Sequence, residues 1–212
     1  MEFEKFIEKY RYLPVISTEN LLAGVSDPGA IQVQMSRWQK TGKLIQLKRG
    51  IYILAEPYRK VEIFDAYLAA ILKNPSYVSL EKALEYHHLI PEAVHVYTSV
   101  TTKRPGEFNT PMGRFHYQHI QTPLFWGYES VAMNNQTAFM AYPEKALLDF
   151  FYFKEIKVTM EYLKELRLQN LEEFSLKRFL EYARRFKKPR VLKAAQLFQQ
   201  YMEMEQGQEK TL

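Results

Sequence analysis

The chain has 212 residues, of which 47% are hydrophobic and 25% are charged, and its net charge is +5. This composition supplies enough apolar side chains for one large or two small folded domains and argues against a disordered chain. The sequence has no cysteine, no secretory signal and no apolar stretch long enough to cross a bilayer, which excludes disulfides and thiolate metal sites and leads us to expect a cytoplasmic protein without a membrane partner.

Three helices are predicted in the first forty or so residues. Apolar residues recur at helical spacing from Phe3 to Tyr10. A helix of about two turns follows Ser17 or Thr18, because either hydroxyl can accept a hydrogen bond from a free backbone amide. A third helix is expected from Asp27 to Thr41, since it starts with a capping carboxylate followed by a proline, which is tolerated at the first helical position.

A β-hairpin with a basic tip is predicted next. After Gly42 the spacing of apolar residues changes from helical to alternating, and two apolar stretches flank Lys48-Arg49-Gly50. Three helices followed by a hairpin is the order of elements in a winged helix-turn-helix, whose third helix enters the major groove of DNA. Because Pro57 and the polar residues after it mark a boundary, we predict a winged helix-turn-helix DNA-binding domain over residues 1–58.

The third helix has two predicted faces. At about 100° per residue, Ile31, Met35 and Trp38 fall on one side, which we expect to face the core. The opposite side carries residue types that read base edges, since Arg can bind guanine, Gln can bind adenine and Val can contact the methyl group of thymine. Basic residues beyond it are expected to neutralise phosphates. The full expected DNA-binding set is Gln32, Val33, Ser36, Arg37, Lys40, Lys43, Lys48 and Arg49.

The distribution of charge favours this interpretation. From Gln32 to Lys60 the sequence has seven bases and one acid. The outward face of the third helix itself carries no acid, which is typical of a surface that meets nucleic acid phosphates. An ordinary solvated helix face, or a winged helix that binds another protein, is the alternative interpretation.

A mixed domain is predicted beyond the boundary. Patterns indicate helices at 61–73, 79–89 and 144–153, strands at 94–102, 113–120, 128–133 and 137–141, and a mostly helical chain from 160 onward. The expected fold class is therefore α+β, with an N-terminal winged helix-turn-helix followed by a mixed α/β domain with a helical C-terminal region. We assign residues 61–206 to a partner-binding domain and residues 207–212 to a frayed tail.

Residue patterns for catalysis are missing from the sequence. Glu144 and Asp149 lie five positions apart on a predicted helix, so they point in different directions and do not form a metal pair. His116 and His119 fall on opposite sides of a predicted strand. Since no glycine-rich phosphate loop is present either, we expect no cofactor, no metal site and no enzymatic activity.

A second basic cluster lies near the C-terminus. It consists of Arg184, Arg185, Lys187, Lys188 and Arg190, with Lys193 nearby and no acid between. A charge run of this kind is typical of a solvated turn between helices. The alternative is a second nucleic-acid surface, or a docking site for an acidic partner.

Several short motifs carry a resemblance to a known family. They are Gly42-Lys43-Leu44 leading to Arg49-Gly50-Ile51-Tyr52, the stretch from Tyr77 to Leu84 with His87-His88-Leu89-Ile90-Pro91, and the stretch from Tyr142 to Asp149. With these motifs, residues 10 to about 155 resemble the AbiEi-type antitoxins of bacterial abortive-infection (type IV) toxin–antitoxin systems. His88 departs from the glycine expected before the leucine.

The resemblance implies a function that composition alone does not. A member of this family represses its own operon through an N-terminal winged helix, and its C-terminal domain counters a nucleotidyltransferase toxin. The expected partners are therefore double-stranded promoter DNA, with inverted repeats bound by a pair of winged helices, and a nucleotidyltransferase toxin. A winged-helix regulator without a toxin partner and a nucleic-acid-processing enzyme are the alternatives.

Overall fold

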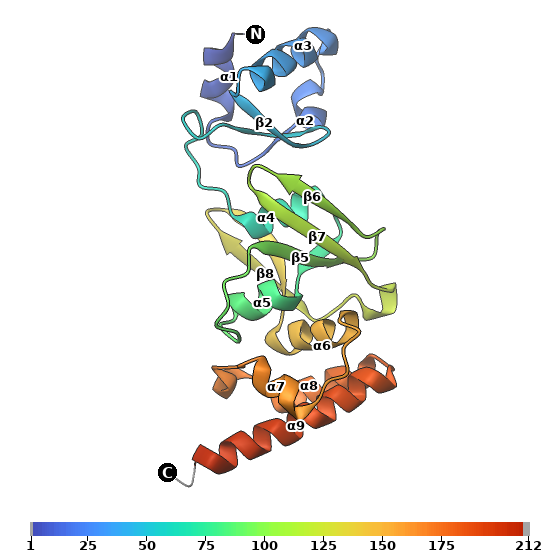
Figure 1. Ribbon diagram of the computed structural model, residues 1–212. Coiled ribbons are helices and arrows are strands. Elements are labelled where there is room, and N and C mark those ends of the chain that lie inside the picture. The colour runs from blue at the N-terminus through green and yellow to red at the C-terminus, as the bar shows by residue number, and fades with distance from the viewer. Residues whose placement is uncertain (1, 210–212) are drawn as a thin grey trace.

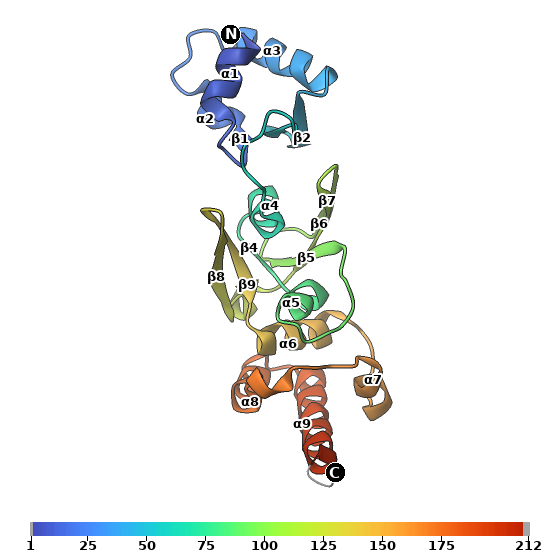
Figure 2. The same ribbon diagram turned by 90° about the vertical axis from the view of Figure 1, so that its left-hand side faces the viewer.

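The computed structural model describes residues 2–209, with side chains described up to residue 204. Figures 1 and 2 show an elongated molecule in which an N-terminal unit, a central sheet and a group of C-terminal helices follow one another along the long axis. In the described part of the chain, no helix combines the length and the apolar character needed to cross a membrane.

The N-terminal unit contains the helices and the hairpin predicted from the sequence, together with one short strand that was not predicted. Its three strands form a sheet in the order β1-β3-β2, in which β3 pairs antiparallel with both neighbours. The strand β1 has two residues, too few to show an alternating pattern. The elements are α1 (Phe3–Tyr10), β1 (Ile16–Ser17), α2 (Thr18–Leu22), α3 (Pro28–Lys40), β2 (Leu44–Lys48) and β3 (Ile51–Leu54).

A mixed six-stranded sheet forms the centre of the molecule. Its strand order is β6-β7-β5-β4-β9-β8, in which β5/β7 and β4/β9 are parallel pairs and the other neighbours are antiparallel. The strands β7, β8 and β9 match predicted strands closely, and β5 is shorter than predicted. The strands are β4 (Ser76–Val78), β5 (Val96–Thr101), β6 (Gly106–Thr110), β7 (Gly113–His119), β8 (Tyr128–Met133) and β9 (Gln136–Ala141).

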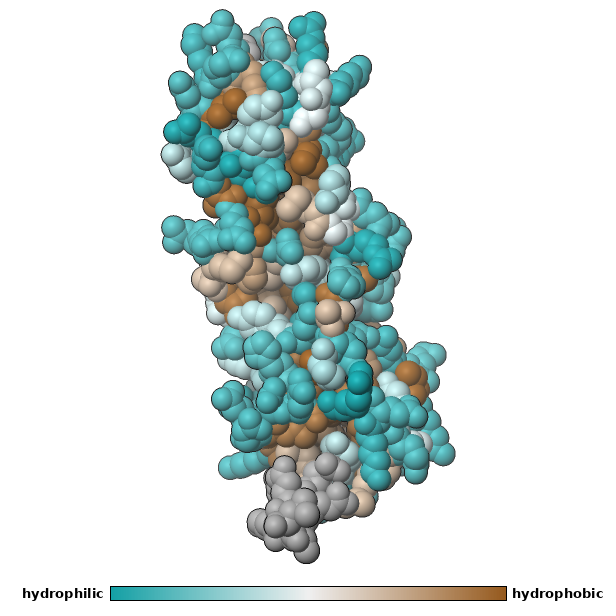
Figure 3. All heavy atoms as spheres, turned by 60° about the vertical axis from the view of Figure 1, so that its left-hand side comes forward, coloured by the Kyte–Doolittle hydropathy of each residue, from teal (hydrophilic) through white to brown (hydrophobic). Residues whose placement is uncertain are grey.

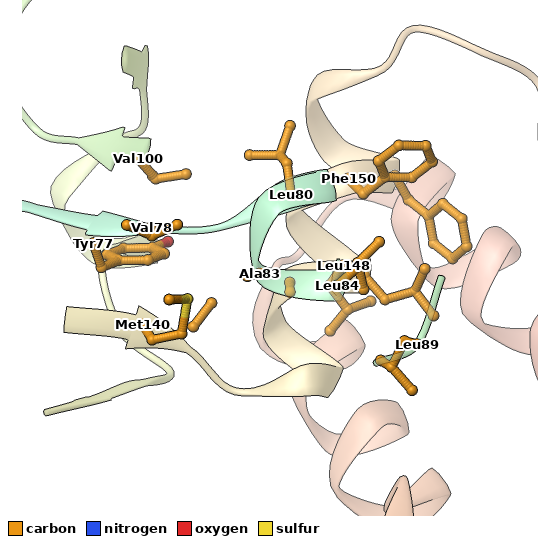
Figure 4. Packing of buried hydrophobic residues seen from close by; sticks show 14 of the residues in the cluster. Tyr77, Val78, Leu80, Ala83, Leu84, Leu89, Val100, Met140, Leu148 and Phe150 are labelled. Carbon is orange, nitrogen blue, oxygen red and sulfur yellow. The ribbon is translucent and has the colours of Figure 1, made fainter. Parts of the chain in front are cut away.

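Three helices accompany this sheet. α4 (Asp65–Leu72) packs against β9 and β4, whereas α5 (Leu80–Tyr86) and α6 (Pro143–Phe153) pack against each other. Figure 4 shows apolar side chains of α5 and α6, among them Leu84 and Leu148, meeting between the two helices. A 3-10 helix, η1 (Thr122–Leu124), leads into β8.

The predicted start of α4 at residue 61 is wrong, because residues 61–64 are not helical. The side chain of Gln136 holds this segment: its Oε1 accepts from the backbone N of Phe64 at 3.0 Å, and its Nε2 donates to the carbonyl oxygen of Glu62 at 2.7 Å. A buried glutamine on β9 thus anchors the connection between the N-terminal unit and the central sheet.

The C-terminal region is helical, as predicted. Its last helix packs against α6, α7 and α8, and it continues to Glu209, so the segment expected to fray is helical up to that residue. Residues 210–212 lie outside the described residues. The elements are α7 (Met160–Glu165), the 3-10 helix η2 (Leu171–Glu173), α8 (Leu176–Arg185) and α9 (Pro189–Glu209).

Buried apolar residues form two clusters, which do not follow the predicted boundary strictly. The smaller cluster lies within the N-terminal unit, but Leu47 and Ile53 of the hairpin belong to the larger cluster of the central sheet and C-terminal helices. On the face drawn in Figure 3, hydrophobic side chains accordingly gather where the N-terminal unit meets the central sheet. The hairpin therefore packs onto the rest of the molecule.

Candidate nucleic-acid interface

Helix α3 presents the predicted outward face to solvent. Met35 and Trp38 are buried and Ile31 packs against the same cluster, as predicted from their spacing. The expected base-reading residues of this helix are all exposed: Gln32, Val33, Ser36, Arg37 and Lys40. Figure 1 shows α3 at the end of the molecule farthest from α9, so this face is open to a large ligand.

Local chemistry fixes the position and rotation of α3. The Asp27 Oδ1 accepts a hydrogen bond from the backbone N of Ala30 at 3.1 Å, which caps the first turn. The Trp38 ring centroid lies 5.1 Å from that of Phe3 and 4.7 Å from that of Phe6. Aromatic packing at these distances holds one side of α3 against α1 and leaves the opposite side free.

A chain of polar side chains connects α3 to the hairpin. Gln39 Nε2 donates to Gln46 Oε1 at 3.2 Å, and Gln46 Nε2 donates to the hydroxyl oxygen of Tyr52 at 3.1 Å. The sequence does not predict these contacts, because they depend on the packing of α3 on β2. These hydrogen bonds help to hold α3 in a fixed position relative to the β2–β3 hairpin.

The three bases expected to meet phosphates are in different environments. Lys43 is half-buried, with its Nζ 4.4 Å from the ring centroid of Phe3. Arg49 is exposed at the hairpin tip. Lys48 Nζ donates to the carbonyl oxygens of Ile71 and Leu72, both at 2.9 Å, at the C-terminal end of α4.

Lys48 thus has its own partners within the protein. Burial lowers the pKa of its ammonium, and the nearby charge of Lys73 lowers it further. The carbonyl groups at a helix C-terminus attract a cation, so this contact stabilises the docking of the hairpin on α4. Lys48 is therefore occupied within the protein, whereas Arg49 remains an exposed candidate for a phosphate contact.

The second basic cluster lies where the sequence placed it, in the turn between α8 and α9 and at its two flanks. Its five bases, Arg184, Arg185, Lys187, Lys188 and Arg190, are all exposed. The guanidinium of Arg185 lies 4.1 Å from the ring centroid of Trp126, and Arg190 donates to the carbonyl oxygen of Tyr152 at 2.6 Å. Two arginines are thus oriented by neighbours while the lysines extend into solvent.

Residues of two separate motifs meet in a fully buried polar network. Lys145 and Asp149, one turn apart on α6, form an ion pair. The Asp149 Oδ2 also accepts from the hydroxyls of Tyr77 at 2.9 Å and Ser79 at 2.8 Å, and Lys145 Nζ donates to the Tyr77 oxygen at 2.7 Å. This network links α6 to β4, and sequence reasoning had treated its members separately.

Burial disfavours the charged form of both partners in this network. It raises the pKa of Asp149, opposed by the ammonium of Lys145 and by the hydroxyls of Ser79 and Tyr77. It lowers the pKa of Lys145, opposed by Asp149. Because both side chains are completely excluded from solvent, they hold the fold together and are closed to a ligand.

Glu144 and Asp149 point in different directions, as their spacing on the helix predicts. Glu144 Oε1 accepts from the backbone N of Ser175 at 2.9 Å, on the side of α8, whereas Asp149 faces β4. Among the residues that the structure describes, no group of three or more His, Asp or Glu side chains is placed to hold a metal ion. His87 Nε2 is used locally and lies 2.7 Å from the carbonyl oxygen of Ala141.

Compared with known proteins, the chain matches no protein-family model and no curated sequence. The assignment of function therefore depends on the arrangement of the chain's own residues.

Proposed function

We propose that the chain is a DNA-binding transcriptional regulator in which α3 enters the major groove. The single observation that carries this proposal is the face of α3: its base-reading residue types are exposed together, at one end of the molecule, on a helix without an acid. Arg37 and Gln32 are the residues we assign to base edges, and Arg49 and Lys43 to phosphates.

The topology of the N-terminal unit supports the finer assignment to a winged helix-turn-helix. The helices α2 and α3 are consecutive and separated by a short turn, and the β2–β3 hairpin follows directly. Strand β1, between α1 and α2, pairs with β3 and closes the small sheet. Two such units from a pair of chains would bind the halves of an inverted repeat.

We further propose that the chain is the antitoxin of a toxin–antitoxin system and represses its own operon. The support comes from the resemblance of three sequence motifs to AbiEi-type antitoxins. Tyr77 and Ser79 lie in one of the motifs, and Lys145 and Asp149 lie in another. The hydroxyls of Tyr77 and Ser79 donate to Asp149, so residues of the two motifs are in direct contact.

The DNA-binding proposal is tested by comparing Arg37→Ala with Arg49→Ala. Loss of a bidentate base contact costs about 1–3 kcal/mol on the specific site, so Arg37→Ala should reduce the preference for the chain's own promoter over random DNA. Arg49→Ala should weaken binding to promoter DNA and to random DNA equally. It should also make the negative slope of log affinity against log salt less steep by about 0.9. Fluorescence anisotropy with both duplexes at several salt concentrations measures these effects.

The matched control is Arg104→Ala, which removes an exposed arginine from the turn between β5 and β6. Its affinity and salt slope should equal those of the wild type. If Arg37→Ala weakened binding to specific and random DNA equally, α3 would not be the reading helix. If the wild type bound no promoter fragment, the regulator proposal would be abandoned.

A regulator without a toxin partner is the second candidate, since the same α3 face supports it. A nucleotidyltransferase gene beside the reading frame favours the antitoxin, and growth rescue in cells that express this toxin tests it directly. Failure of the full-length chain to rescue growth would leave the plain regulator.

A further inference from the structure

Four of the five exposed bases around the α8–α9 turn, all except Arg184, line two neighbouring hollows. One, of about 350 Å³, is lined by Gln121, Pro123, Leu124, Arg185, Phe186, Lys187 and Lys188. The other, of about 590 Å³, is lined by Pro105, Gln118, His119, Tyr152, Phe153, Glu155, Lys188, Pro189, Arg190 and Val191. Because Lys188 belongs to both, they form one continuous basic surface, which we name the α8–α9 surface.

The positive charge of this surface is not neutralised by ion pairs among the residues that the structure describes. In the described part of the chain, none of the five bases forms an ion pair. Of the acidic side chains that the structure describes, Glu155 alone lines either hollow. A concentration of unpaired bases lining hollows attracts an anionic ligand and raises its local concentration.

Aromatic rings at the same surface narrow the chemistry of that ligand. Tyr152 and Phe153 line the larger hollow and are half-buried, and the half-buried Trp126 ring already stacks against Arg185. Basic side chains beside aromatic rings are typical of sites that bind single-stranded nucleic acid. The lysines and arginines contact the phosphates, and the unpaired nucleobases stack on the rings. An acidic peptide would use the charges and leave the rings without a partner.

We propose that the α8–α9 surface is a second nucleic-acid site that binds a single strand. It is separate from the α3 face, because Figures 1 and 2 place α3 and the C-terminal helices at opposite ends of the long molecule. The inference does not depend on DNA binding by α3. Lys187 and Lys188 meet phosphates, and Phe153 provides a stacking platform.

Binding of a labelled 12-nucleotide strand, as RNA and as DNA, to the full chain tests the proposal. Lys187→Ala with Lys188→Ala should make the negative slope of log affinity against log salt less steep by about 1.4, because each single-strand phosphate contact contributes about 0.7 to its magnitude. Phe153→Leu should weaken binding about tenfold with an unchanged slope, because stacking on a ring involves no ion release. The RNA and DNA arms show which strand is preferred.

The matched control is Lys164→Ala with Lys177→Ala, two exposed lysines on α7 and α8 that line neither hollow. It should leave both affinity and slope unchanged. An equal effect in the control would overturn the proposal, as would failure of the wild type to bind either strand. Displacement of the strand by polyglutamate at equal charge concentration would also overturn it in favour of an acidic protein partner.

Discussion

The buried ion pair of Asp149 and Lys145 should be sensitive to the loss of either partner. Both side chains are fully buried, so neither charge is stabilised by water. Asp149→Asn would leave the ammonium of Lys145 in this interior without a counter-charge. We expect the free energy of unfolding to fall by about 3–5 kcal/mol, the usual cost of breaking one side of a buried ion pair. Urea unfolding followed by circular dichroism measures this loss.

The control for Asp149→Asn is the double change Lys145→Met with Asp149→Leu. Replacing both charges by apolar groups of similar size leaves no unpaired charge, so the double variant should be more stable than Asp149→Asn. A double variant less stable than the single one would show that the hydrogen bonds to Tyr77 and Ser79 outweigh the ion pair.

His87 predicts how stability depends on pH. Burial lowers the pKa of this imidazole below its ordinary 6.5, opposed by the hydrogen bond to Ala141 and by the charges of Glu129 and Glu144. The unfolded chain therefore binds a proton at a higher pH than the folded chain does. The stability contributed by His87 is present above pH 6.5 and is lost as the pH falls below that value.

His87→Gln keeps a donor near Ala141 and removes the titrating group. The free energy of unfolding of the wild type should fall more steeply between pH 7 and pH 5 than that of the variant. Denaturation curves at half-unit pH steps give both slopes, and parallel slopes would contradict the assignment.

At the scale of elements, the hairpin joins the N-terminal unit to the central body. Leu47 and Ile53 enter the larger core, and Lys48 binds the carbonyl groups at the end of α4. Lys48→Met preserves the aliphatic stem and removes the donor. We expect it to reduce the free energy of unfolding by about 1–2 kcal/mol, because two partly buried carbonyl groups lose a charged partner.

DNA binding separates this structural role from a phosphate contact. Lys48→Met should retain the salt slope of the wild type on duplex DNA, whereas Arg49→Ala at the same hairpin tip should lower it. If Lys48→Met also made the salt dependence of DNA binding less steep, Lys48 would contact a DNA phosphate, and its proposed structural role would be wrong.

The elements that the sequence predicted well are those with a long or strongly marked pattern. Helix α3 has an N-cap, a proline and a clear apolar stripe, and the turn at Asn134-Asn135 places both residues at positive φ, which asparagine tolerates. The sequence pattern does not predict strands β4 and β6. The three residues of β4 are all buried, so no alternation is visible, and β6 is a polar edge strand that starts with glycine.

The candidate site divides in the same way. The rotation of α3 follows from helical periodicity, so the exposed positions of Gln32 and Arg37 could be derived from the sequence. The partner of Lys48 could not, because it depends on how α4 packs against a hairpin more than twenty residues earlier. The same holds for Tyr77 and Asp149, which are 72 positions apart in the chain.

For the whole molecule, the long axis places the proposed DNA-reading face and the C-terminal region at opposite ends (Figure 1). We therefore expect the two proposed activities, repression and toxin neutralisation, to be separable. Removal of residues 1–58 is a poor test, since it also removes Leu47 and Ile53 from the larger core. The combined change Gln32→Ala, Arg37→Ala and Lys40→Ala affects only exposed side chains and leaves this core intact.

The triple variant should lose binding to its promoter and still restore growth to cells that express the neighbouring toxin. Promoter binding in vitro and growth rescue from an unrelated promoter, at equal protein levels, measure the two activities independently. Asp149→Asn is the reciprocal control, because it destabilises the central sheet and its helices, which we propose counter the toxin, and changes no residue of α3. Loss of rescue in the triple variant would mean that protection requires DNA binding, and the two activities would then belong to one mechanism.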